Sequence, residues 1–86
     1  MSIEGRLKIA QSGHGYVATF TPYAVEHWPP GVALPLESRE AAATFLEEIG
    51  TGPRRITEIM ADLRDVGRVF LPMIAVTPEQ RQTYRL

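Results

Sequence analysis

The chain has 86 residues, of which 44% are hydrophobic and 22% charged, so it is long enough for one domain over residues 1–86 and too short for two. The absence of cysteine excludes disulfides, thiolate metal clusters and thiol catalysis, and a formal net charge of −1 gives nucleic acid no strong overall attraction. No apolar run approaches the roughly 18–20 residues that span a bilayer, and the N-terminus lacks a secretory pattern, so we expect a soluble, cytoplasmic protein.

The first predicted element is an antiparallel β-hairpin. Residues 5–10 alternate polar and apolar side chains, with Leu7 and Ile9 on one face, which indicates a half-buried strand. Turn-forming residues follow over 11–15, and residues 16–21 are rich in β-branched and aromatic side chains. We therefore predict two strands joined by a loop of three to five residues, with the second strand ending at Pro22.

Residues 22–36 form the least regular part of the sequence, which we call the arm. Prolines at 22, 29, 30 and 35 fix the backbone and favour extended geometry in the residues that precede them. Residues 32–36 are accordingly predicted to be extended, as a short edge strand.

Two helices are predicted next, because apolar residues recur at helical spacing in two successive stretches. Ser38 is suited to cap the first helix and Gly50 to end it, while Pro53 begins the second and Gly67 ends it. The apolar stripes are Ala42, Phe45, Leu46 and Ile49 in the first helix and Ile56, Ile59, Met60 and Leu63 in the second.

A strand interrupted at Pro72 is expected over residues 68–76, and Thr77 with Gln80 forms a capping-box pattern that begins a short helical turn. The predicted fold class is α+β, with an N-terminal hairpin and a later edge strand packed against an αα-hairpin. The expected core is Leu7, Ile9, Phe20, Phe45, Leu46, Ile49, Ile56, Ile59, Met60, Leu63 and Phe70.

No set of residues suggests a catalytic, cofactor or metal site. His14 lies between two glycines in the hairpin turn, but a phosphate-binding loop would lead into a helix and this turn leads into a strand. Glu26 and His27 are adjacent and would point to opposite faces of a strand, so they are not expected to share a metal ion. A small enzyme is therefore the third and least favoured hypothesis.

The stretch from Ala41 to Leu71 resembles a winged helix-turn-helix in the spacing of two helices and a following strand. That resemblance implies a DNA-binding regulator, with Arg54, Arg55 and Arg68 as the residues that contact the nucleic acid. The outer face of the second helix opposes it, because Glu58, Asp62 and Asp65 would line that face with negative charge. DNA binding is therefore the alternative hypothesis.

The favoured hypothesis is a non-catalytic protein-interaction module that acts as a homodimer or an accessory subunit. Aromatic side chains on a stiff proline-rich backbone are typical of residues that dominate interface energy. The predicted contact residues, all in the arm, are Tyr23, Trp28, Pro29, Pro30 and Leu34.

Overall fold

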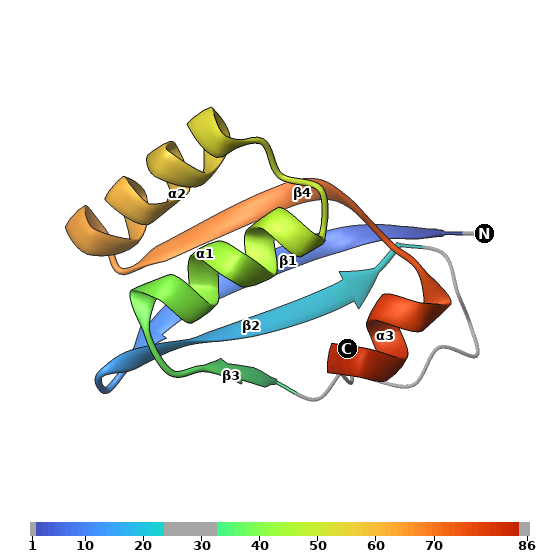
Figure 1. Cartoon of the computed structure of the whole chain (residues 1–86), viewed down its shortest axis with the longest axis horizontal. Helices are drawn as coiled ribbons and strands as arrows, with labels where there is room; N and C mark the ends of the chain where they lie inside the picture. The colour runs from blue at the N-terminus through green and yellow to red at the C-terminus, as the bar shows by residue number, and fades with distance from the viewer. Residues whose placement is uncertain (1, 24–32, 85–86) are drawn as a thin grey trace.

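A computed structural model describes residues 2–23 and 33–84 of the chain. Its centre is an antiparallel sheet of four strands in the order β3-β2-β1-β4 (Figure 1). The strands are β1 (Ile3–Ser12), β2 (Gly15–Pro22), β3 (Leu34–Leu36) and β4 (Arg68–Val76). The helices are α1 (Arg39–Glu48), α2 (Pro53–Asp65) and α3 (Pro78–Tyr84). The predicted α+β class, with its hairpin, later edge strand, helix pair and C-terminal helical turn, is confirmed.

The β1–β2 hairpin turns more tightly than predicted. Ser12 pairs with Gly15, so the loop contains only Gly13 and His14 rather than three to five residues. Gly13 has a φ of +60°, in the left-handed region that two-residue hairpin loops require and that glycine adopts at little cost. His14 lies exposed at the tip of the hairpin.

Both long helices begin and end as the sequence predicts. The Ser38 side chain accepts a hydrogen bond from the Ala41 amide at 3.1 Å, which caps α1. At its other end the Thr51 amide donates to the Leu46 carbonyl and the Gly50 amide to the Glu47 carbonyl, which is a Schellman motif with Gly50 at φ +92°. Pro53 opens α2, and Gly67 at φ +87° closes it.

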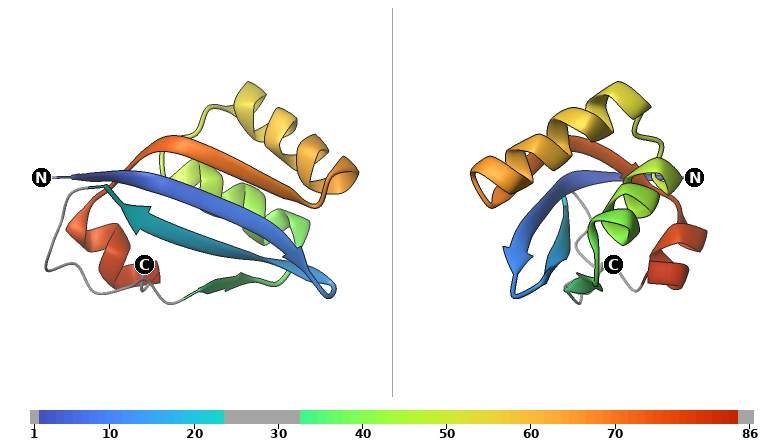
Figure 2. Two further views of the ribbon diagram at one scale, coloured as in Figure 1. Left: turned by 180° about the vertical axis from the view of Figure 1, so that it is seen from behind. Right: turned by 60° about the vertical axis from the view of Figure 1, so that its left-hand side comes forward.

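The helices α1 and α2 cover one face of the sheet, as the two turned views show (Figure 2). The core lies between them and the strands. Its buried apolar residues are Leu7, Ile9, Tyr16, Ala18, Phe20, Leu36, Ala42, Phe45, Leu46, Ile59, Met60, Leu63, Val69, Leu71 and Val76. Ile49 and Ile56 pack against this core but are only partly buried.

Strand β4 is continuous across Pro72 but contains a bulge there. Gly5 pairs with Ile74 and Leu7 pairs with Leu71, so Arg6 of β1 lies opposite two residues of β4, Pro72 and Met73. The extra residue shifts the alternation of side chains by one. Consequently Val69 and Leu71 before the bulge, and Val76 after it, are all buried on the core side.

The prediction that Phe70 belongs to the core is wrong. Phe70 pairs with Lys8, and Leu7 and Ile9 on either side of Lys8 face the core, so Phe70 points to the other face of the sheet. Its side chain is 49% exposed. The run Val69-Phe70-Leu71 is wholly apolar, so the side-chain alternation that orients a strand is not visible in it.

Candidate functional site

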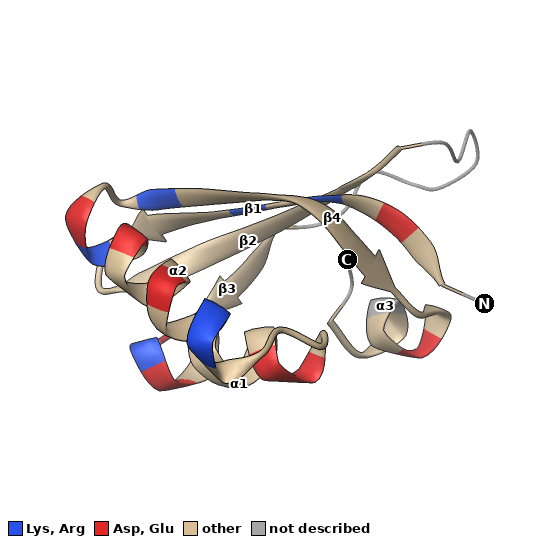
Figure 3. Ribbon diagram, turned by 90° about the horizontal axis from the view of Figure 1, so that it is seen from above, with Lys and Arg blue, Asp and Glu red and all other residues tan. Residues whose placement is uncertain are grey.

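The face of the sheet turned away from α1 and α2, which we call the open face, is cationic. Arg6 and Lys8 of β1 and Arg68 of β4 are exposed, and each belongs to the set of residues that alternates with the buried ones. Figure 3 shows basic positions along these two strands with one acidic position near the N-terminus, whereas the helices carry both acidic and basic positions. The strands of the sheet therefore carry a net positive charge, although the chain as a whole is close to neutral.

Phe70 lies among these cations. The ammonium nitrogen of Lys8 lies 5.8 Å from the centre of the Phe70 ring, within the range of a cation–π interaction. Arg68 is two residues before Phe70 on the same face of β4, and Arg6 is two residues before Lys8 on β1. An exposed aromatic ring is thus flanked by three basic side chains.

Tyr23 bridges the sheet at the end of β2. Its amide donates to the Glu4 carbonyl at 3.2 Å, which continues the pairing of β2 with β1 by one residue. Its hydroxyl donates to the carbonyl of Pro72, at the bulge of β4 on the far side of β1. The ring therefore lies across β1 and remains 54% exposed.

A groove borders the outer edge of β4, next to the loop that joins α1 to α2, and we call it the β4 groove. It has a volume of about 430 Å³ and lies between the loop that joins α1 to α2 and the second half of β4. Its lining consists of Ile49, Gly50, Thr51, Gly52, Arg55, Leu71, Pro72, Met73, Ile74 and Ala75. Met73 is 67% exposed, and Arg55 is the charged residue of the lining.

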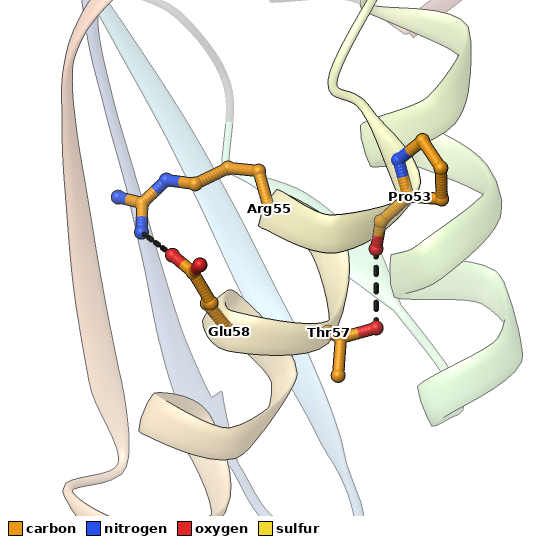
Figure 4. Close-up of polar contacts among 4 residues, drawn as sticks. All are labelled: Pro53, Arg55, Thr57 and Glu58. Atoms are coloured by element: carbon orange, nitrogen blue, oxygen red, sulfur yellow. Dashed lines mark hydrogen bonds and ion pairs between the residues drawn. The ribbon is translucent and has the colours of Figure 1, made fainter.

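The residues predicted for DNA binding are not brought together. Arg54 and Arg55 lie in the first turn of α2, whereas Arg68 begins β4 after the far end of that helix. Thirteen helical residues span about 20 Å, which separates the two ends. Arg55 is further engaged by Glu58 at 3.1 Å, and Thr57 donates to the Pro53 carbonyl at the same distance (Figure 4).

The outer face of α2 is acidic, as predicted. Glu58, Asp62 and Asp65 are exposed, while Ile59, Met60 and Leu63 of the same helix are buried. The Arg64 guanidinium donates to Asp65 at 3.0 Å, and this hydrogen bond lowers the pKa of the Asp65 carboxyl below its ordinary value. Asp65 therefore stays ionised and paired with Arg64, as Glu58 is paired with Arg55, which leaves Asp62 as the carboxylate of this face outside an ion pair.

The predicted arm contacts can be placed only in part. Tyr23 is exposed as described above, and Leu34 lies in β3, partly buried against the core. Trp28, Pro29 and Pro30 lie outside the described residues. The prediction of an arm-mediated contact stays a prediction.

Within residues 2–23 and 33–84, no group of three or more His, Asp or Glu side chains could hold a metal ion. The hydroxyl of Ser38 is committed to the cap of α1, and Ser12 is exposed next to the hairpin turn. Over the same ranges, no helix is long and apolar enough to cross a membrane.

Sequence reasoning missed both surfaces, the open face and the β4 groove. The open face could have been found from the alternation of side chains in β1, because Arg6 and Lys8 alternate along that strand with the buried Leu7 and Ile9. The groove had no such local signal, since its lining combines the α1–α2 loop with a strand about twenty residues later. Comparison of the chain with protein-family models, with curated proteins and with solved structures finds no match.

Proposed function

We propose that the chain is a non-catalytic protein-interaction module, and that it forms a homodimer through the β4 groove. The observation that carries the proposal is Met73, a large apolar side chain 67% exposed at an apolar groove. A flexible, unbranched thioether side chain suits contact surfaces that must adapt to a partner. Exposed apolar groups beside a concave apolar lining are typical of protein contact sites.

A second copy of the chain is the occupant that the charges favour. The ionic side chain in the groove lining, Arg55, is already paired with Glu58, so two grooves can meet without a net repulsion. The open face cannot associate with itself in this way, because Arg6, Lys8 and Arg68 would face their own copies. A two-fold axis beside β4 would place the Met73 of each copy in the groove of the other.

The proposed contact is made by side chains rather than by a continuous sheet. β4 is an edge strand, but Pro72 has no amide hydrogen and the bulge at Pro72 and Met73 interrupts its regular edge. Backbone pairing of two β4 strands would be broken at this point. Insertion of Met73 into a groove does not need that pairing.

Sedimentation velocity across a range of about 10–500 μM tests the proposal. We expect a concentration-dependent dimer for the native chain, and we expect Met73→Asn to weaken dimerisation by roughly 5- to 150-fold, because an unpaired amide would be buried in an apolar site. The matched control is Val66→Asn, since Val66 is 68% exposed but follows α2 away from the groove. A native chain that stays monomeric at 500 μM, or a control that weakens the dimer equally, would contradict the proposal.

The other hypotheses receive less support. The separation of Arg54 and Arg55 from Arg68 gives a winged-helix mode of DNA binding no geometric basis. We propose no catalytic role, since the described residues offer no convergent acid, base or nucleophile for one. A cytoplasmic location stays a prediction from the sequence.

A further inference from the structure

We propose that the open face of the sheet binds single-stranded nucleic acid, with Phe70 stacking on a base and Arg6, Lys8 and Arg68 contacting phosphates. This inference does not depend on dimerisation, although the open face adjoins the β4 groove at Met73, which lies opposite Arg6. It also differs from the winged-helix hypothesis, because it uses strands rather than the N-terminus of α2.

The first argument is the arrangement of the side chains. The register places Lys8 between Thr19 of β2 and Phe70 of β4, and Arg6 next to Thr21. Residues two apart on one strand face are about 7 Å apart, so Arg6 and Lys8 form a short row of positive charge beside the ring. The threonine hydroxyls add donors and acceptors on the same face.

The second argument is that these cations are uncompensated. Among the described residues, the ion pairs join Arg55 to Glu58 and Arg64 to Asp65, and both lie in α2. Arg6, Lys8 and Arg68 take part in neither pair. Glu4 is the acidic residue that β1, β2 and β4 contribute. A polyanion is therefore attracted to the open face more than to α2, whose arginines and acidic residues balance each other.

The third argument concerns the form of the nucleic acid. A ring that lies on a sheet can stack only on a base whose face is free, and a duplex hides those faces between neighbouring base pairs. Non-sequence-specific binding of single strands combines basic groups that follow the backbone with aromatic rings under the bases. The open face supplies both, and we expect it to hold a few nucleotides.

Fluorescence anisotropy with a labelled 15-nucleotide oligothymidylate tests the proposal, with a 15-base-pair duplex beside it. We expect the native chain to prefer the single strand, and log K to fall with log salt with a slope of about −2 for three phosphate contacts. The triple variant Arg6→Ala, Lys8→Ala, Arg68→Ala should lose at least ten-fold in affinity and most of the slope.

The matched control is Arg39→Ala, Arg54→Ala, Arg55→Ala, which removes the same three charges from α1 and α2 and should change affinity less than two-fold. Phe70→Leu should weaken binding roughly 5- to 100-fold while Phe70→Trp retains it, because stacking needs the ring.

Three results would overturn the inference. One is no binding of the single strand at 50 mM salt with several hundred micromolar protein. Another is an equal loss of affinity in the control variant with three arginines removed from α1 and α2, which would mean that net charge alone explains the binding. The third is equal binding of the duplex or of polyglutamate with no effect of Phe70→Leu, which would mark the open face as a surface for polyanions in general.

Discussion

Phe45 and Phe70 are the same residue type in opposite surroundings, which makes them a test at the scale of single residues. Phe45 is 2% exposed in the core, whereas Phe70 is 49% exposed on the open face. We expect Phe45→Ala to lower the free energy of unfolding by about 3–5 kcal/mol. Phe70→Ala should cost about 1 kcal/mol, since only about half of the side-chain surface is buried and the cation–π contact with Lys8 is exposed to solvent.

Urea unfolding followed by circular dichroism measures both changes. An 86-residue domain has a total stability of roughly 4–13 kcal/mol, so the Phe45 variant should lie close to the limit of folding. Equal losses for the two variants would mean that β4 is paired one residue out of register. The comparison therefore tests the orientation of the open face without any ligand.

The residue scale also explains what sequence reasoning could assign. Leu7 and Ile9 were placed correctly because charged residues alternate with them and reveal the buried face. The prediction for Phe70 is wrong because both its neighbours are apolar, so the sequence shows no alternation there and the size of the side chain alone favours burial. Only the pairing with Lys8, which joins residues far apart in the sequence, decides which way it points.

At the scale of elements, α3 depends on contacts at both of its ends. Its seven residues are too few for a stable isolated helix. The Thr77 amide donates to the Gln80 side-chain oxygen at 3.0 Å and the Gln80 amide to the Thr77 hydroxyl at 3.1 Å, which confirms the predicted capping box. The Gln80 Nε2 also donates to the Glu48 carbonyl at the end of α1, and Tyr84 packs edge-to-face on Phe45.

We expect Gln80→Ala to release α3, because it removes one half of the capping box and the bond to α1 together. The expected loss is about 0.5–2 kcal/mol, with faster hydrogen exchange of the α3 amides. Gln80→Glu is the control, since the carboxylate still accepts from the Thr77 amide but cannot donate to the Glu48 carbonyl. The exchange rates of its α3 amides should lie between those of the native chain and those of Gln80→Ala. Unchanged exchange in Gln80→Ala would show that Tyr84 alone holds the helix.

The bounds of the helices are the most predictable feature of the fold, because they depend on hydrogen bonds between residues close in the sequence. The caps at Ser38, Gly50, Gly67 and Thr77 each rest on hydrogen bonds between residues at most five positions apart, so a short stretch of sequence contains the whole signal. The bulge in β4 has no such local signal, because it depends on pairing with a strand far away in the sequence. Pro72 predicts an interruption of the strand, but the pairing of β4 with β1 decides whether the strand ends there or continues through a bulge.

At the scale of the whole molecule, the two free edges of the sheet determine how the chain can associate through its backbone. The hydrogen bond from the Tyr23 amide to the Glu4 carbonyl shows that the backbone polar groups of Tyr23 point toward β1. The direction of these groups alternates along a strand, so the backbone polar groups of Val17, six residues earlier, also point toward β1. Pro35 of β3 pairs with Val17, whose backbone groups point away from β3. The backbone groups of Pro35 therefore point away from β2, toward the free edge of the sheet. Pro72 interrupts the other edge in β4. Neither proline can donate an amide hydrogen to a further strand.

These prolines should keep association limited to the side-chain contact proposed at the β4 groove. We expect the double variant Pro35→Thr, Pro72→Thr to form species larger than a dimer, because each edge regains a donor and the threonines favour strands. Light scattering during incubation a few degrees below the unfolding transition measures this growth. Pro53→Ala is the control, since Pro53 lies in α2 and its replacement restores no amide hydrogen to either sheet edge, so the scattering should stay unchanged. A double variant that scatters like the native chain would mean that the short β3 and the bulge protect the edges without their prolines.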